Sequence, residues 1–225
     1  MEEESNISSN PETFNIEIKI SKTDLPVPVI RNVHLHSIYN PERESNSLIS
    51  ANIDTFEKSS KILVFGLGFA YHLVALEKCL TNLYGKNFQV YVIEPNTHLV
   101  KKWKEIRPNI LDPRIKIMSF DNVKGFYQNK ELVEFMSEKP SIFPHQASFQ
   151  LNESFFRSFM SFHYPSSIKE SLDFIESPKF KNYLESFDTS LTTEEFLQEV
   201  NEKPMVQGYD FLTLAFKSII IPEKI

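Results

Sequence analysis

The sequence lacks the features that mark several protein classes. It contains one cysteine, Cys79, so no internal disulfide can form, which fits a reducing compartment. The longest mostly apolar run, Ile62 to Leu76, is too short to cross a bilayer and contains two glycines and a histidine. The first ten residues lack both the basic and the apolar region of a secretory signal. These absences predict a cytoplasmic protein without a membrane span.

An excess of positive charge is also missing. The chain has 24 Lys and Arg residues against 30 Asp and Glu residues, a formal net charge of −6, so it has no general basic field for a nucleic-acid backbone. We therefore expect no nucleic acid as a partner. The 225 residues and the 41% hydrophobic content, with 20 phenylalanines, suffice for one full domain with a core and a smaller appendage.

Glycine is rare, and the place of two glycines is informative. Gly66 and Gly68 stand one residue apart among only five glycines, directly after the apolar run 61–65. An amphipathic segment follows, and then a second apolar run that ends at Glu94. This is the pattern of a nucleotide-binding βαβ unit.

The wider alternation of strands and helices predicts an α/β protein with a Rossmann-like, methyltransferase-like parallel sheet and flanking helices. We expect a disordered tail (1–12), a small β extension with a lead-in helix (13–60), a Rossmann-like core (61–165) and a mainly helical C-terminal part (166–225). In the extension, segments 14–20 and 29–35 are predicted strands and 22–28 a turn, and Asn40 and Pro41 begin a helix that runs to about 53. The predicted core strands are 61–65, 89–93, 115–120 and 141–143, and the predicted helices are 70–83, 95–106, 130–138, 153–162, 168–175 and 193–200. Segment 211–221 fits a helix or an edge strand.

The residues of the glycine turn narrow the choice of ligand. Gly66 permits a sharp turn, and Gly68 lets the backbone approach a ligand closely. The third glycine of a dinucleotide fingerprint would fall at Tyr71, which argues against NAD or FAD. A methyltransferase-type loop places its third small residue at Ala70 instead, so S-adenosylmethionine or a nucleotide remains a candidate cofactor.

Acidic residues at two further strand ends extend this pattern. Glu94 stands where a carboxylate accepts the ribose hydroxyls, and Asp121 where an acidic side chain meets an adenine amino group. In the alternative reading the turn is only structural, Glu94 caps the next helix and Asp121 is solvated. Phe65, where methyltransferases often carry an acidic residue, favours this alternative. The predicted cofactor-binding set is Gly66, Gly68, Ala70, Tyr71, His72, Glu94, Asp121 and Asn122.

Other candidate chemistry is weaker. His34 and His36 share one face of a strand but have no third ligand in the sequence, so no metal site is predicted. Tyr39 and Arg43 either cover a ligand or pack structurally. His145 follows the fourth strand, where many methyltransferases contact their acceptor. No Ser-His-Asp, Cys-His or paired-carboxylate arrangement is evident from spacing, so catalytic residues are not assigned.

Four blocks together resemble a known family. They are 36–44 (HSIYNPERE), 64–73 (VFGLGFAYHL), 92–96 (VIEPN) and 143–149 (FPHQASF). They are similar to the N-terminal region of the motility-associated factor (Maf) proteins, bacterial glycosyltransferases that attach nonulosonic acids such as pseudaminic or legionaminic acid to flagellin. The resemblance spans about residues 14–160. The family's loop resembles Gly-x-Gly-x-Gly-Tyr-His, so Tyr71 and His72 match and Ala70 replaces a glycine.

This resemblance implies a Rossmann-like domain and an association with glycosylation. In the family, sugar transfer belongs to a central domain that follows this region, and 225 residues leave no room for it. We therefore expect a stand-alone module that binds a nucleotide-type ligand or another protein in flagellar or surface glycosylation, and that does not itself transfer sugar. Its expected partner is a glycosylation-system protein or a sugar nucleotide. The alternative is an S-adenosylmethionine-dependent methyltransferase of a small-molecule or sugar substrate.

Overall fold

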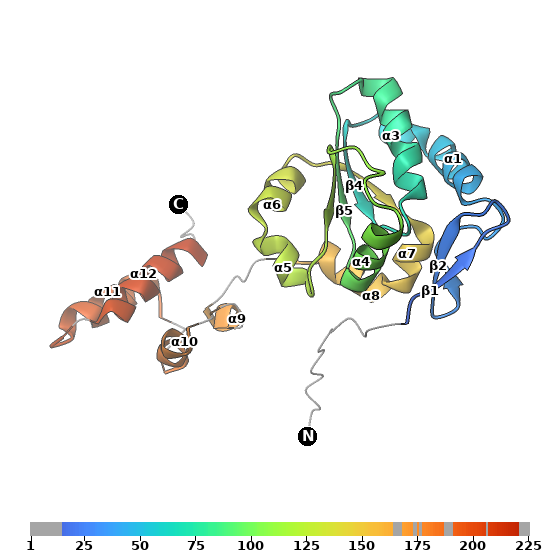
Figure 1. The fold of residues 1–225 in the computed structure, drawn as a ribbon. Coiled ribbons are helices and arrows are strands. Elements are labelled where there is room, and N and C mark those ends of the chain that lie inside the picture. Colours follow the sequence, from blue (N-terminus) through green and yellow to red (C-terminus); the bar gives the residue numbers. More distant parts are fainter. Residues whose placement is uncertain are drawn as a thin grey trace. The chain divides into compact units, whose positions relative to one another are not determined.

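The computed structural model describes residues 15–163, 168–172, 175, 177–186, 191–205 and 207–220. The predicted tail at 1–12 and the start of the first predicted strand at Phe14 lie outside these ranges. The chain forms two compact units, Met1–Phe162 and His163–Ile225 (Figure 1). The candidate site lies entirely in the first unit.

The first unit begins with a small antiparallel sheet. Its strands are β1 (Glu17–Ile20), β2 (Pro26–Ile30) and β3 (Val33–His34), with β2 in the centre. The prediction of one strand over 29–35 is wrong, because Arg31 and Asn32 adopt φ values of 50° and 63° and turn the chain back as a two-residue hairpin loop. The predicted turn at 22–28 is also too long, since β2 already begins at Pro26.

A helix links this sheet to the core. Helix α1 (Pro41–Ala51) begins as predicted, with the side chain of Asn40 accepting a hydrogen bond of 2.9 Å from the Arg43 N–H. It ends at Ala51, slightly before the predicted end at about residue 53. After Asn52 the short helix α2 (Ile53–Phe56) follows. Helix α1 packs against α3 (Tyr71–Tyr84), the helix that follows the glycine turn.

The core sheet confirms the predicted fold class. Its order is β6-β5-β4-β7 and all neighbouring pairs are parallel, as in a Rossmann-like fold. Within this sheet, β4 comes first in the sequence, and it has β5, the second core strand, on one side and β7, the last, on the other. The point between β4 and β7 is where such sheets bind ligands. The strands are β4 (Lys61–Phe65), β5 (Gln89–Ile93), β6 (Ile115–Met118) and β7 (Ser141–Pro144).

Helices cover both faces of this sheet (Figure 1). Ile62 and Val64 point into a cluster with residues of α3, whereas Leu63 and Phe65 point into a cluster rich in phenylalanine. Phe65 stacks on Phe156 with ring centroids 4.9 Å apart. A strand that is buried on both faces explains the continuous apolar run in its sequence. The remaining helices of this unit are α4 (Thr97–Ile106), α5 (Val123–Gln128), α6 (Lys130–Ser137), α7 (Gln146–Leu151) and α8 (Glu153–Met160), of which α5 and α7 were not predicted.

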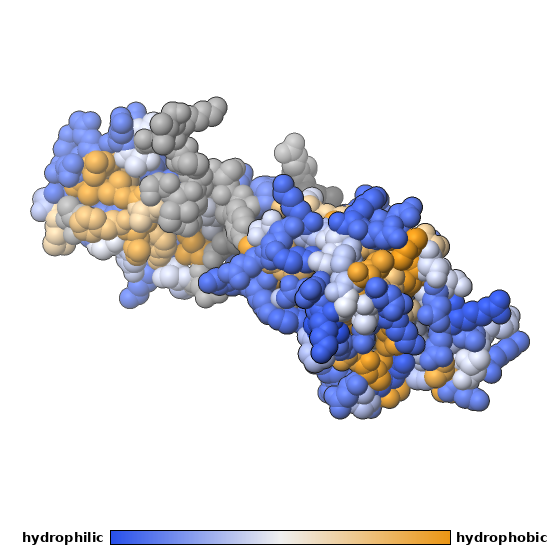
Figure 2. Space-filling model, turned by 90° about the horizontal axis from the view of Figure 1, so that it is seen from above, coloured by the Kyte–Doolittle hydropathy of each residue, from blue (hydrophilic) through white to orange (hydrophobic). Residues whose placement is uncertain are grey.

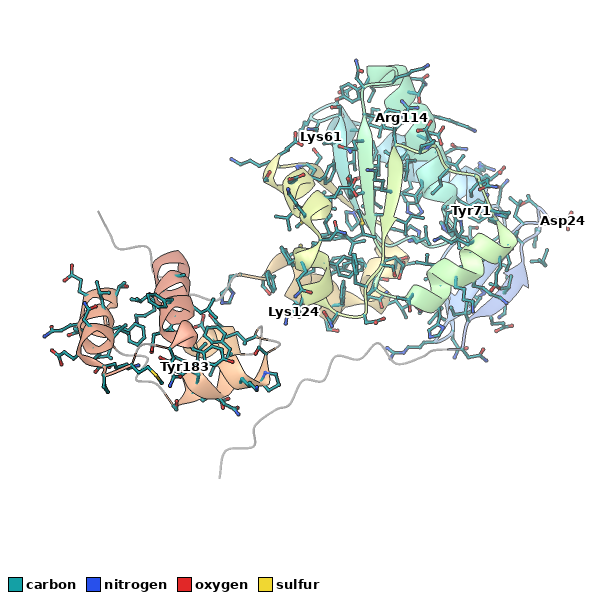
Figure 3. The ribbon with its side chains drawn as sticks, turned by 60° about the vertical axis from the view of Figure 1, so that its left-hand side comes forward. Asp24, Lys61, Tyr71, Arg114, Lys124 and Tyr183 are labelled. Atoms are coloured by element: carbon teal, nitrogen blue, oxygen red, sulfur yellow. The ribbon has the colours of Figure 1, made fainter. Side chains whose placement is uncertain are left out.

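The second unit is helical where it is described, with α9 (Ile168–Ser171), α10 (Pro178–Glu185), α11 (Thr193–Glu202) and α12 (Gly208–Ile220). The open choice at 211–221 is resolved as helix up to Ile220. Buried Asp210 accepts hydrogen bonds from the Tyr183 hydroxyl and the Lys203 ammonium and so ties α10, α11 and α12 together (Figure 3 labels Tyr183). Among the described residues, no helix has both the length and the apolar character needed to cross a bilayer.

Candidate functional site

The glycine turn connects β4 to α3 and is the centre of the candidate site. Gly66 has a φ of +101° and Gly68 a φ of +51°, so both use backbone conformations that other residues rarely adopt. Ala70, with a φ of 63°, adopts the left-handed conformation without being glycine and holds about 1 kcal/mol of strain. The Gly66 N–H donates to the Ile93 carbonyl at 2.9 Å, which anchors the turn to the neighbouring strand.

Side chains of the protein itself lie against both glycines. A Cβ added to Gly66 would lie 2.1 Å from the Cβ of Ser148, and one added to Gly68 would lie 2.4 Å from Nε2 of His36. These positions therefore need glycine because other parts of the same chain approach the turn. Ser148 comes from α7 and His36 from the loop after β3, so the turn is enclosed from two directions.

Glu94 is also directed into the turn. Its side chain is fully buried, Oε2 accepts a hydrogen bond from the Leu67 N–H at 2.8 Å, and Oε1 accepts one from the Asn96 N–H at 2.9 Å. Burial raises the pKa of Glu94 to about 7, although both N–H groups act in the opposite direction. The N-cap of α4 is Asn96 and not Glu94, so the capping role in the alternative reading is wrong.

Asp121 and Asn122, which follow β6, are exposed. The Asn122 side chain accepts a hydrogen bond of 2.9 Å from the Gly125 N–H and caps α5. The structure therefore brings Glu94 into contact with the glycine turn, while Asp121 and Asn122 face solvent at the next strand end. A cofactor role for the predicted set stays a prediction.

Tyr71 connects the turn to the N-terminal sheet. Its hydroxyl donates to the Pro26 carbonyl at 2.9 Å, and the Arg107 guanidinium lies 3.8 Å from the centre of its ring. Arg107 also donates to the Phe69 carbonyl of the turn. Tyr71 thus packs between the core and the extension, and its ring is buried.

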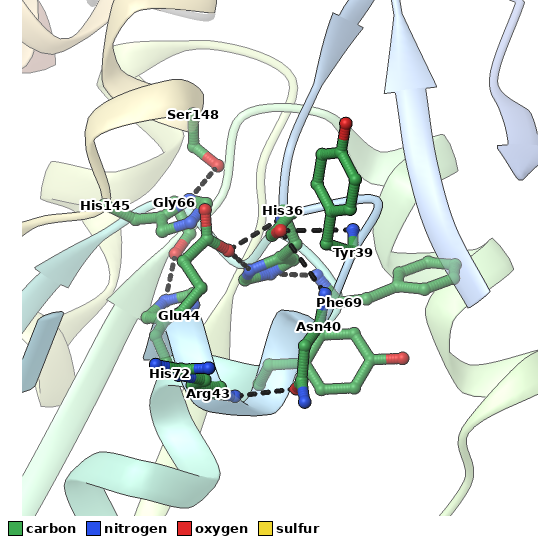
Figure 4. Close-up of polar contacts among 12 residues, drawn as sticks. His36, Tyr39, Asn40, Arg43, Glu44, Gly66, Phe69, His72, His145 and Ser148 are labelled. Atoms are coloured by element: carbon green, nitrogen blue, oxygen red, sulfur yellow. Dashed lines mark hydrogen bonds and ion pairs between the residues drawn. The ribbon is translucent and has the colours of Figure 1, made fainter. Parts of the chain in front are cut away.

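Three buried histidines from distant parts of the sequence meet beside the turn (Figure 4). His36 follows β3, His72 lies in the first turn of α3, and His145 follows β7. The rings of His72 and His145 are stacked with centroids 4.2 Å apart, and His36 lies 4.7 Å from His145 and 5.5 Å from His72. The cluster therefore occupies the position between β4 and β7 where a Rossmann-like sheet would receive a ligand.

Hydrogen bonds to the backbone assign the tautomers of His36 and His72. Nε2 of His36 accepts from the Phe69 N–H at 3.1 Å, so its proton is on Nδ1, which lies 3.5 Å from Oε2 of Glu44. Nε2 of His72 donates to the Gly66 carbonyl at 3.1 Å, which leaves Nδ1 as an acceptor. Nδ1 of His145 lies 2.8 Å from the Ser148 hydroxyl.

All three imidazoles are held in their neutral form. Burial is the main cause that lowers the pKa of His36, His72 and His145, and the pKa values of the last two lie well below the ordinary range. Neutral imidazole is the form that binds metal ions. One nitrogen from each ring lies within 4.8 Å of the others.

The prediction that His34 and His36 share one face of a strand is wrong, because β3 ends at His34. His34 is exposed, whereas His36 meets His72 and His145. His72 and His145 lie 36 and 109 positions further along the chain than His36. A strand order with β7 beside β4 would have indicated that the residues after both strands share one end of the sheet.

Three surface pockets of this unit lie outside the histidine cluster. One lies along α1 and includes Asn40 and Arg43, one lies between α1 and α3, and one lies near Lys61 and Arg114 (Figure 3 labels both). Tyr39 is exposed, with the Lys22 ammonium 4.5 Å from its ring centre. Arg43 thus lines a surface pocket, and the exposed ring of Tyr39 lies beside the ammonium of Lys22, which is also exposed.

The chain was compared with protein families, curated proteins and solved structures. The sequence matches no protein-family model and no curated protein. Among solved structures, the chain is similar to the crystal structure of MnmC2 from Aquifex aeolicus, with 17% sequence identity and a TM-score of 0.35. The match covers 58% of this chain and 58% of that chain. The assignment to a Rossmann-like, methyltransferase-like fold class therefore depends on the parallel β6-β5-β4-β7 sheet and its flanking helices.

Proposed function

We propose that the chain is a Rossmann-like module of the type that begins Maf proteins, and that it binds another protein in flagellar or surface glycosylation without transferring sugar itself. One observation carries the choice of protein binding over nucleotide binding. The groups of the glycine turn that would hold a nucleotide are engaged within the chain, by Glu94, Ser148 and His36.

A nucleotide needs free groups at this turn. In a working site the backbone N–H groups face a phosphate or carboxylate, and the acidic residue after the second strand faces the ribose. Here the Leu67 N–H donates to Glu94, and the Phe69 N–H donates to His36. Both carboxylate oxygens of Glu94 accept backbone N–H groups, and the side chain has no exposed surface. A ligand would first have to displace these internal contacts.

Apolar side chains on the surface support binding to a protein. Tyr39 is 62% exposed and Ile142, on the edge strand β7, is 49% exposed. In the second unit Phe211 and Leu212 of α12 are 63% and 52% exposed, and hydrophobic surface is visible there in Figure 2. Adjacent exposed apolar side chains such as Phe211 and Leu212 are the feature that indicates a partner-binding surface, whereas single ones such as Tyr39 and Ile142 are ordinary.

The experiment that tests this proposal measures small ligands and protein partners separately. Thermal shift with S-adenosylhomocysteine, nucleotides and sugar nucleotides, each at millimolar concentration, should give no midpoint shift, and calorimetry should give no heat of binding. A ligand at one hundred times its dissociation constant would stabilise the protein by about 2.7 kcal/mol, which is several degrees. Such a shift, if abolished by Glu94→Gln, would overturn the proposal.

The positive half of the test uses flagellar and glycosylation proteins as purified partners. Size-exclusion chromatography and calorimetry should detect a complex with one of them. Phe211→Ser should weaken it at least tenfold if α12 forms the contact, and Tyr39→Ser should do so if the first unit forms it. Lys130→Ser, at an exposed site on α6, serves as the control. If none of these proteins binds, the proposal of protein binding is overturned.

A second candidate is an S-adenosylmethionine-dependent methyltransferase of a small-molecule or sugar substrate. It is favoured by one observation, the placement of Gly66, Gly68 and Glu94 at adjoining ends of β4 and β5 in a sheet with the order of a methyltransferase. This candidate predicts that S-adenosylhomocysteine binds and that Glu94→Ala abolishes binding. It is rejected if a well-folded sample shows no heat of binding at millimolar ligand.

A further inference from the structure

We propose that His36, His72 and His145 bind a divalent transition-metal ion, with Zn²⁺ as the best fit, and that this ion fastens the N-terminal extension to the core. The proposal goes beyond the proposed function, because metal binding requires neither a nucleotide nor a protein partner. It starts from the convergence of three imidazoles at one buried point (Figure 4).

His72 and His145 each have one nitrogen bonded to the protein and one left for a ligand. His72 donates its Nε2 proton to the Gly66 carbonyl, and its Nδ1 has no hydrogen-bond partner among the described residues. Nδ1 of His145 is bonded to the Ser148 hydroxyl, which leaves Nε2. In His36, Nδ1 lies 3.5 Å from the Glu44 carboxylate and Nε2 accepts the Phe69 N–H, a hydrogen bond that a metal ion would have to replace. A carbonyl, a hydroxyl and a carboxylate behind the ring nitrogens are the usual outer partners of metal-binding histidines.

The unpartnered Nδ1 of His72 is the most direct indication of a ligand. A polar atom buried without a hydrogen bond is costly, and native proteins rarely retain one without a reason. Beside it, the stacked rings of His72 and His145 are buried together, and neither ring carries a charge that would repel a cation. Because the lone pair of an imidazole nitrogen lies in the ring plane, a metal ion at the ring edge would bind Nδ1 of His72, and the stacked ring of His145 would have to tilt to bind the same ion.

The donor set indicates which ion would bind. Three imidazoles without a thiolate suit Zn²⁺, Cu²⁺ or Ni²⁺ far better than Mg²⁺ or Ca²⁺, which prefer oxygen ligands. Three histidines with a fourth position for water is an established zinc arrangement. The Glu44 carboxylate lies 3.5 Å from Nδ1 of His36 and favours a bound cation, while the positive charge of Arg107 opposes it.

Binding would require a small adjustment of the rings. Nitrogens around a tetrahedral zinc ion lie roughly 3.3 Å apart, given bonds of about 2.0 Å, whereas here one nitrogen from each ring lies within 4.8 Å of the others. Rotation about the side-chain torsions can close this gap. Metal binding at Nε2 of His36 would replace its hydrogen bond from the Phe69 N–H, so the glycine turn would also shift on binding.

The consequence for the molecule follows from where the three residues originate. His36 belongs to the extension that precedes the core, whereas His72 and His145 belong to the ends of the two central strands. An ion bound by all three would therefore cross-link the extension to the sheet. Because such an ion binds the folded chain and not the unfolded chain, it would raise the thermal midpoint.

The experiment uses the full chain after treatment with EDTA and dialysis. Equilibrium dialysis against ZnCl₂ with elemental analysis should give one bound zinc per chain, and the thermal midpoint should rise with ZnCl₂ and return with chelator. MgCl₂ should have no effect. Co²⁺ should give the visible absorption bands of a four-coordinate ion. A wild-type protein that binds no stoichiometric zinc would overturn the proposal.

Matched variants locate the ion. His72→Asn and His145→Asn should each weaken zinc binding more than one hundredfold, whereas His34→Asn and His98→Asn, which change exposed histidines, should leave it unchanged. Glu44→Gln removes only the charge behind His36 and should weaken binding roughly tenfold without unfolding the protein. Circular dichroism checks that each variant is folded. Loss of binding in His34→Asn or His98→Asn, with retention in Glu44→Gln, would assign the ion to the surface and overturn the proposal.

Discussion

Two neighbouring strands of the core sheet each end near a carboxylate, and the two carboxylates have opposite surroundings. Glu94 follows β5 and is fully buried against the glycine turn, while Asp121 follows β6 and is exposed. Strand ends that look equivalent in a sequence pattern can therefore differ completely in what they offer to a ligand. The difference arises because α7 and the extension pack against the glycine turn that Glu94 faces, whereas the end of β6 leads through a short loop to the capped helix α5.

The largest expected loss of stability is at Gly66, in the glycine turn that follows β4. Gly66→Ala should destabilise the protein by about 4 kcal/mol, because the new Cβ would collide with Ser148 and the φ of +101° is strained for alanine. Urea unfolding followed by circular dichroism measures this loss. Gly85→Ala is the matched control, since Gly85 also has a positive φ but no atom within 4 Å of an added Cβ, and it should cost only about 1 kcal/mol.

A double substitution separates crowding from strain at Gly66. Ser148→Gly removes the Cβ that lies 2.1 Å from the position of the new methyl group. In the Gly66→Ala background it should recover roughly half of the lost stability, because only the steric part is relieved. Equal losses of stability for Gly66→Ala and Gly85→Ala would mean that no side chain crowds Gly66. The contrast between the buried glycine turn and the exposed Asp121 would then not hold.

The second prediction concerns the charge of Glu94. Its pKa in the folded protein, about 7, is raised above the ordinary 4.5, so the folded state binds a proton more tightly than the unfolded state. The stability that this proton contributes is complete below pH 4.5 and is lost as the pH rises through 7. Glu94→Gln cannot titrate, so the stability of wild type relative to this variant should fall by about 2 kcal/mol between pH 5 and pH 8.

Urea unfolding of both proteins across this pH range measures the difference, and the histidines cancel because both proteins contain them. Parallel pH curves for wild type and Glu94→Gln would show that the Glu94 carboxylate is hydrated in the folded protein.

A smaller loss of stability is expected from substitutions at the exposed residues that follow β6. Asn122→Ala should cost about 1 kcal/mol, because the side chain of Asn122 caps α5 through its hydrogen bond with the Gly125 N–H. Asp121→Ala, one position earlier, should cost less than about 0.5 kcal/mol. Thermal unfolding of both variants compares them directly, and a larger loss for Asp121→Ala would reveal a structural role for that carboxylate.

The smallest predicted effect is a gain. Ala70 adopts a φ of 63°, a conformation that favours glycine, so Ala70→Gly should relieve strain and raise stability by roughly 0.5 kcal/mol. A small rise in the urea midpoint with an unchanged slope would agree. A fall in stability would show that the buried methyl group of Ala70 contributes more to packing than the strain costs.

Much of the fold was predictable because its signals are local. The apolar runs of β4 and β5 identify strands that are buried on both faces, and the Asn40 cap with Pro41 identifies the start of α1. Where local signals conflict, prediction was wrong. Arg31 and Asn32 form a tight turn without a glycine, so the sequence shows one continuous strand in place of a hairpin.

The sequence alone determined the α/β class, the position of the glycine turn and the chemical character of the residues around it, since each depends on neighbours in the chain. Only the tertiary structure decided what occupies that turn. Ser148 reaches Gly66 across more than eighty positions, and His36, His72 and His145 come from three separate elements. Such contacts depend on the order of strands in the sheet and on helices packed over its end, and this arrangement is not written in any single segment. A turn with the sequence of a ligand site is thereby closed by its own protein.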